Sequence, residues 1–158
     1  MVLEISGIVF AMLGASLSMG LAAIGSGMGV YFAGSAGAGV LAEDPTKFGQ
    51  ALVYDVLPQT QGVYGLLGAI LIMLGTGIMG GEAPSVEVGM AALFIGLVIG
   101  LGGLTAIPQG QTAAAGIAAT AKNPGAFAGG IIFTVMVETF AIFSLLIGIL
   151  AMLGFGII

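Results

Sequence analysis

Four long apolar runs, separated by three short polar turns, constrain this chain more than any other feature of its sequence. The runs cover roughly residues 7–41, 48–79, 88–120 and 127–157. Each exceeds the ~20 residues that an α-helix needs to cross about 30 Å of hydrocarbon. Because lipid leaves unpaired backbone groups without partners, each run is expected to be helical. The predicted fold is therefore an all-α membrane protein with four transmembrane helices.

The charge content excludes several classes of protein. Charged residues make up 6% of the chain, whereas soluble domains carry about 25%. Two basic residues cannot neutralise a phosphate backbone, so nucleic acid is excluded as a partner. The absence of Cys and His excludes disulfides and thiolate or imidazole metal sites. Membrane lipid is the expected surrounding.

The polar turns predict an orientation. They cover residues 43–47, 80–87 and 122–125, and the two lysines lie in the first and third. The positive-inside rule places these two turns in the cytoplasm and both termini outside. The chain is thus expected to be a multi-pass protein of the cell membrane.

The second half of the chain repeats the first. Its 158 residues are two lengths of 79, and at this offset Pro45 matches Pro124 without a gap. We therefore expect two tandem units, 1–79 and 80–158, each a helical hairpin, in parallel orientation. This arrangement argues against inverted-repeat transporters. Glycines crowd the first and third runs, which predicts close helix packing or the tight inner circle of a ring.

Glu138 lies deep inside the fourth run. A charged carboxylate at the bilayer centre costs on the order of 3 kcal/mol on insertion scales, so such a residue indicates a functional site. The alternative is a protonated Glu that only bonds a neighbouring helix. Gln109 and Glu138 each lie about 14 residues, or ~21 Å, from the turn between them, and hence at equal depth.

Four neutral polar residues share the predicted depth of Glu138. They are Gln59, Thr60, Gln61 and Gln109. The counterpart of Gln109 in the first run is the apolar Val30, so that run is expected to contribute nothing. Na⁺ is a hard ion that takes several oxygen ligands in place of water, whereas a proton needs only the carboxylate. The layer therefore favours a Na⁺ site, although Li⁺ or a hydrated proton would use the same oxygens.

Two prolines adjoin the layer. Pro58 removes the helical partner of the Tyr54 carbonyl, and Pro108 does the same for Leu104. The change is either an ordinary kink or an unwinding that exposes carbonyl oxygens to a cation.

Two further residues have open roles. Tyr64 shares a helical face with Thr60 and Gln61, and its hydroxyl is expected to bond Glu138. Asp55 is either an accessory ion-pathway or gate residue, or it faces the cytoplasmic headgroups.

Three motifs carry a resemblance to a known family. They are Leu57-Pro58-Gln59-Thr60-Gln61-Gly62-Val63-Tyr64-Gly65, Pro108-Gln109-Gly110 and Val137-Glu138-Thr139. With these, the whole chain resembles the duplicated membrane-ring subunit of V-type rotary ATPases, the proteolipid or K subunit, in its bacterial sodium-transporting form.

The resemblance implies a homo-oligomeric ring that ATP hydrolysis elsewhere in the complex turns. Helices 1 and 3 would line its inside. The chain would catalyse no bond chemistry itself. Its partners would be a static membrane subunit with an essential arginine and central-stalk subunits on the cytoplasmic side. The implied Na⁺ ligands are the Leu57 carbonyl, Thr60, Gln61, Gln109 and Glu138, with Tyr64 orienting Glu138.

The chain departs from that family pattern at two positions, where Gln59 replaces Gly and Asp55 replaces Gln. Three alternatives stay open: a proton-specific ring, a small Glu-dependent multidrug-type exporter, and a purely structural assembly protein.

Overall fold

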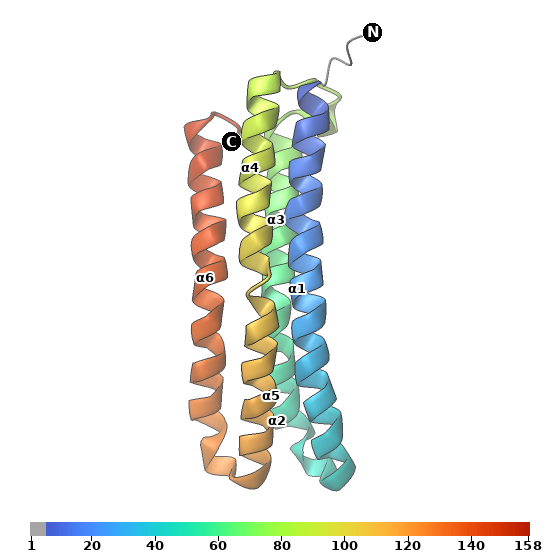
Figure 1. The fold of residues 1–158 in the computed structure, drawn as a ribbon, viewed down its shortest axis with the longest axis vertical. Coiled ribbons are helices and arrows are strands. Elements are labelled where there is room, and N and C mark those ends of the chain that lie inside the picture. Colours follow the sequence, from blue (N-terminus) through green and yellow to red (C-terminus); the bar gives the residue numbers. More distant parts are fainter. Residues whose placement is uncertain (1–5) are drawn as a thin grey trace.

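The computed structural model describes residues 6–158, which form an elongated bundle of long helices (Figure 1). The first long segment is α1 (Gly7–Glu43). The second comprises η1 (Pro45–Lys47), α2 (Phe48–Val56), η2 (Leu57–Gln59) and α3 (Thr60–Gly75). After η3 (Ile78–Gly80), the third comprises α4 (Val86–Gly103) and α5 (Ala106–Lys122), and the fourth η4 (Pro124–Ala126) and α6 (Phe127–Gly154). The all-α class with four membrane-length segments is confirmed.

The segments repeat at the offset of 79 residues. Gly7–Glu43 corresponds to Val86–Lys122, and Pro45–Gly75 corresponds to Pro124–Gly154. The turn between the helices of each hairpin is also the same. Asp44 Oδ1 accepts the Thr46 N–H, and Asn123 Oδ1 accepts the Gly125 N–H, each at 3.0 Å. An acidic or amide residue before proline thus begins the second helix of both hairpins.

Glycine lets α1 lie directly on the backbone of α4 and α5. A Cβ added at Gly14 or Gly25 would collide with the carbonyl oxygen of Ala92 or Gly103, respectively. Between membrane helices, van der Waals packing of this kind drives association, because lipid is as apolar as the side chains. The close packing predicted from the glycine content is therefore present in the bundle.

The helix break at Pro58 distinguishes the two predicted alternatives. The Tyr54 carbonyl, expected to lose its partner, accepts the N–H of Leu57 where α2 ends and η2 begins. One turn of 3-10 helix thus closes the gap that proline leaves in the i→i+4 pattern. Of the two alternatives for Pro58, the structure therefore supports a local change of the helix that leaves this carbonyl paired.

The third segment breaks in the same way before Pro108. The Leu104 carbonyl accepts the Ile107 N–H at 3.1 Å, so it is not bared to a cation either. Leu104 and Thr105 separate α4 from α5. Both prolines therefore tighten the helix locally at the level of the polar residues.

The start of α1, the end of α6 and the connection before α4 lie at one end of the bundle, and the turns at Pro45 and Pro124 lie at the other (Figure 1). The N-terminal residue, whose placement outside the membrane was predicted, falls outside the described residues. This arrangement puts the helix breaks and Glu138 in the interior of the bundle's length, away from either end.

Candidate ion-binding site

A chain of polar groups crosses the apolar bundle between α3 and α5. The side chains of Gln61 and Gln109 are fully buried. Gln61 Nε2 donates a hydrogen bond to Gln109 Oε1. Buried amides need such partners, because an unpaired polar group in an apolar environment is costly. The two glutamines, 48 residues apart in sequence, thus form one cross-helix pair.

The 3-10 turn adds oxygens to this pair. The Thr60 hydroxyl donates to the Leu57 carbonyl at 2.9 Å and lies 3.2 Å from Gln61 Oε1. A carbonyl, a hydroxyl and an amide oxygen therefore gather around Thr60. Oxygens of this kind are the ligands that an alkali cation takes in place of its hydration shell.

Glu138 of α6 is held by a tyrosine of α3. The Tyr64 hydroxyl donates to Glu138 Oε1 at 2.6 Å, and both side chains are half-buried. This is the contact expected from the helical spacing of Tyr64 with Thr60 and Gln61. A short bond to a charged acceptor fixes the orientation of the carboxylate.

The two hydrogen-bonded groups meet on α3. Thr60, Gln61 and Tyr64 fall within about one turn of this helix, and through Gln61 and Tyr64 it is hydrogen-bonded to Gln109 and Glu138, respectively. Within residues 6–158, no cluster of three or more His, Cys, Asp or Glu side chains could hold a metal ion. One carboxylate among neutral oxygens suits a monovalent hard cation or a proton.

Gln59 does not join this group. Its side chain is exposed, whereas Gln61 is buried. Residues two apart on a helix point about 200° away from each other, so both cannot face the same interior. The predicted layer of five polar side chains is therefore reduced to four.

Helix α1 contributes a polar group that the sequence reasoning missed. Ser26 Oγ accepts the Gly62 N–H at 2.7 Å and lies 3.5 Å from the Gln59 carbonyl. The expectation that the first helix contributes nothing, based on Val30, was wrong. The signal available was a serine one helical turn before Val30, one of the few polar residues of that run.

Asp55 lies away from the polar chain, on the side of α2 that faces α1. Its Oδ1 would lie 3.2 Å from a Cβ added at Gly34. This oxygen is buried and has no hydrogen-bond partner among the described residues. Asp55 is thus beside α1, and its place is compatible with an accessory role rather than with ion coordination.

The fold and this site together define a class: a membrane protein of two tandem hairpins with a tyrosine-bonded carboxylate, Glu138, inside its last helix. The sequence model for the C subunit of ATP synthase matches twice, at residues 13–72 and 93–151. The chain belongs to this family, within the proteolipid branch of the V/A-type ATPases, whose members include the K subunits.

Relatives of known name span several kinds of ATPase. The chain is 45% identical to the A-type ATP synthase subunit K of Methanocaldococcus jannaschii, over 93% of this chain and 63% of that one. It is 42% identical to the V-type sodium ATPase subunit K of Enterococcus hirae, over 94% and 93%. It is 29% identical to the 16 kDa proteolipid of the V-type proton ATPase of Ovis aries, over 89% of each. The chain thus spans less than two thirds of the archaeal relative.

Proposed function

We propose that this chain is a rotor-ring subunit of a V/A-type ATPase and that it carries Na⁺ across the membrane. The observation that carries the proposal is a set of hydrogen-bonded polar groups around the start of α3. Tyr64 holds Glu138 there, and Leu57, Thr60, Gln61 and Gln109 supply linked oxygens. The names of the relatives divide between sodium and proton. The oxygen set is therefore the argument for the ion.

The donor set supports Na⁺ over a bare proton. A proton requires only one carboxylate with a suitable pKa. A Na⁺ ion loses its water on entering the membrane, and neutral oxygens must replace that water. Thr60 and Gln61 supply such oxygens on the same helix, and the Glu138 charge balances the cation.

Transport follows from the cost of charge in lipid. With an ion bound, the Glu138 site is neutral and can turn through the bilayer. An empty, anionic site is costly in lipid and stays near a positive charge on a static membrane subunit, which we propose to be an arginine. Rotation driven by ATP through central-stalk subunits then delivers one ion per chain per revolution. In this proposal Lys47 and Lys122 lie at the cytoplasmic end.

Carbodiimide labelling of Glu138 tests the ion directly. The reagent modifies the protonated carboxyl, so bound Na⁺ should slow the reaction, and more strongly at higher pH, because proton and Na⁺ compete for one group. The rate is measured against Na⁺ concentration at two pH values. Gln109→Leu should require about tenfold more Na⁺ for the same protection, since it removes one ligand without removing the carboxyl.

Two carboxyl variants are the controls. Glu138→Gln should abolish labelling and ATP-driven transport while the protein still assembles. Asp55→Asn should leave both the labelling and its Na⁺ protection unchanged. If Na⁺ protects at neither pH, the sodium proposal fails and the chain is better described as a proton ring. If Glu138→Gln transports normally, the rotor site itself is misplaced.

A further inference from the structure

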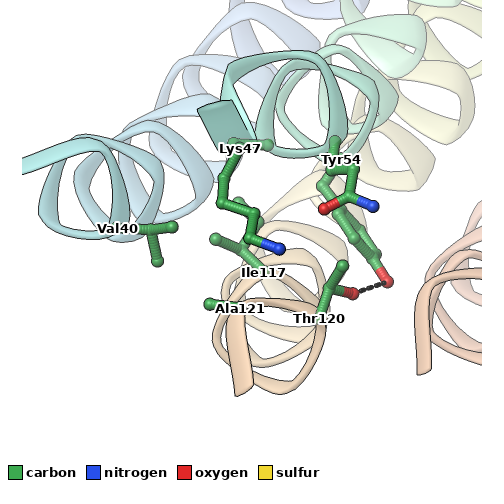
Figure 2. A pocket seen from close by; sticks show the side chains of 8 residues that line it. Val40, Lys47, Tyr54, Ile117, Thr120 and Ala121 are labelled. Atoms are coloured by element: carbon green, nitrogen blue, oxygen red, sulfur yellow. Dashed lines mark hydrogen bonds between the residues drawn. The ribbon is translucent and has the colours of Figure 1, made fainter. Parts of the chain in front are cut away.

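Tyr54 of α2 lies at the centre of the interface between the two hairpins, which we call the junction. It is fully buried, its hydroxyl lies 3.1 Å from Thr120 Oγ1, and it donates to the Phe127 carbonyl at 3.0 Å. Figure 2 shows Tyr54 pointing toward Thr120. Its ring also meets that of Phe127 edge to face, with centroids 5.6 Å apart. One aromatic side chain thus connects the first hairpin to α5 and to the start of α6.

Two glycines make room for this side chain. A Cβ added at Gly130 would collide with the Tyr54 hydroxyl, and one added at Gly116 would collide with its ring. The junction therefore requires an aromatic ring from α2 and the absence of a side chain at two points on α5 and α6. Packing fit of this kind determines which membrane helices associate.

The aromatic residue of this junction and the residues that receive it both have counterparts 79 residues away. Within one chain these counterparts do not contact each other. The counterpart of Tyr54 is Phe133 of α6, which is 66% exposed. Gly116, Gly130 and Thr120 have three counterparts on α1 and α2. They are Gly37, Ala51 and Leu41, and all three line a groove of about 200 Å³ between these helices. An exposed ring and an open groove thus repeat the two sides of the internal junction.

We propose that Phe133 of one copy enters the groove between α1 and α2 of a second copy, so that the contact between copies repeats the junction within each copy. The inference rests on the proposed function, since it requires a ring of identical chains. The operation that moves the first hairpin onto the second, applied again to the second hairpin, gives the position of the first hairpin of the neighbouring copy. That position is beside α6.

The residue differences between the two junctions compensate for one another. Inside the chain, the Tyr54 hydroxyl lies against Gly130. Between copies, Phe133 has no hydroxyl, and Ala51, in the place of Gly130, fills that space with its methyl group. Leu41 replaces Thr120, so the groove also loses the hydroxyl that meets Tyr54. The position that contacts the ring remains glycine, at Gly37. The aromatic fit is thus repeated between chains without the Tyr54–Thr120 hydroxyl contact, in a groove that Asp55 also lines.

The exposure of α6 supports the same face. Phe140 is 62% exposed, and its counterpart Gln61 is fully buried. Ile132 is 60% exposed, and its counterpart Val53 is also exposed, at 42%. Exposed residues of α6 whose counterparts are buried, such as Phe133 and Phe140, are therefore expected to be covered by a second copy. Those whose counterparts are exposed, such as Ile132, are expected to face lipid.

A second groove, on the copy that supplies Phe133, also belongs to the proposed contact between copies. Between α5 and α6 lies a groove of about 430 Å³, which includes Gly116, Ala119 and Phe133. Ala38 on α1 is exposed, whereas its counterpart Ile117 is 3% exposed against the first hairpin. Helix α1 of the second copy is thus the element that covers this groove.

Substitutions that exchange the two junctions test the proposal. Phe133→Tyr places a hydroxyl against the Ala51 methyl group, and the fraction of rings that survive SDS at a fixed temperature should fall about tenfold. Adding Ala51→Gly and Leu41→Thr to Phe133→Tyr recreates the internal junction and should restore ring survival. Ile132→Tyr puts the same side chain one position away, toward lipid, and should leave ring survival unchanged.

Three results overturn the docking: intact rings with Phe133→Tyr alone, no rescue by the combined variant, or equal loss with Ile132→Tyr. Rescue distinguishes a lost interface from a misfolded chain. Na⁺ protection of Glu138 is measured on the same preparations. If Na⁺ does not protect Glu138 but the variants change ring survival as predicted, only the sodium proposal is refuted. A wild type that forms no ring at all refutes the rotor proposal.

Discussion

At the scale of single residues, the geometry assigns a positioning role to Tyr64. Its hydroxyl is bonded to the one carboxylate of the site, while the surrounding oxygens come from Leu57, Thr60 and Gln61. A carboxylate in an apolar environment without this bond has more rotamers open to it. Ordering Glu138 in advance reduces the entropy lost when an ion binds.

Tyr64→Phe should therefore weaken Na⁺ binding without removing a ligand. A hydrogen bond to a charged group contributes about 1.5–3 kcal/mol, which corresponds to a loss of about tenfold or more in affinity. The measurement is the Na⁺ concentration that half-protects Glu138 from carbodiimide. Tyr31→Phe is the matched control, because Tyr31 is 67% exposed on α1. Equal protection in the two variants would refute the positioning role.

At the scale of elements, contact between helix backbones decides how the bundle packs. At Gly29, an added Cβ would collide with the Ala106 carbonyl and lie 2.6 Å from the Pro58 Cβ. That one glycine thus joins α1 to α5 and to the proline turn that carries the site oxygens. Its packing and the ion site are therefore linked.

Gly29→Ala should lower the free energy of unfolding by about 1–3 kcal/mol, because overpacking forces the two helices apart. Gly39→Ala is the matched control, since an added Cβ there has nothing within 4 Å and the counterpart residue is already Ala118. The measurement is the thermal unfolding midpoint of the protein purified in detergent. An unchanged midpoint for Gly29→Ala, or equal shifts for both variants, would contradict this account.

At the scale of the whole molecule, the two ends of the bundle differ in charge. Both lysines lie by the turns at Pro45 and Pro124, while Glu82 in the loop before α4 and Glu87 in the first turn of α4 lie at the other end. The positive-inside rule thus still predicts that the turns at Pro45 and Pro124 are cytoplasmic. The orientation decides from which side the central stalk binds the ring.

Single cysteines test the orientation cleanly, because the chain has none of its own. Ala42→Cys and Ala83→Cys lie at opposite ends, and both positions are exposed. A membrane-impermeant maleimide added to intact cells should label only Ala83→Cys, and permeabilised cells should label both. Labelling of Ala42→Cys in intact cells, with none of Ala83→Cys, would reverse the orientation.

The sequence alone determined the number of membrane-length segments, their approximate bounds, the repeat and the carboxylate. These features depend on local properties: the length of apolar runs, the polar Pro-containing turns that interrupt them, and the cost of a charge in hydrocarbon. The repeat also kept the relation between Phe133 and Tyr54 visible, because an ungapped offset preserves helical register. The depth of Gln109 opposite Glu138 followed from a fixed rise per residue.

The tertiary structure decided which polar groups meet, because that depends on how each helix is rotated against its neighbours. Gln61 faces the interior and Gln59 does not, although the sequence predicted the same depth for both. Ser26 reaches Gly62 only because α1 packs closely on the second segment. The carbonyls of Tyr54 and Leu104 accept hydrogen bonds from other N–H groups in tighter turns. These bonds form because an acceptor without a partner is costly in an apolar interior.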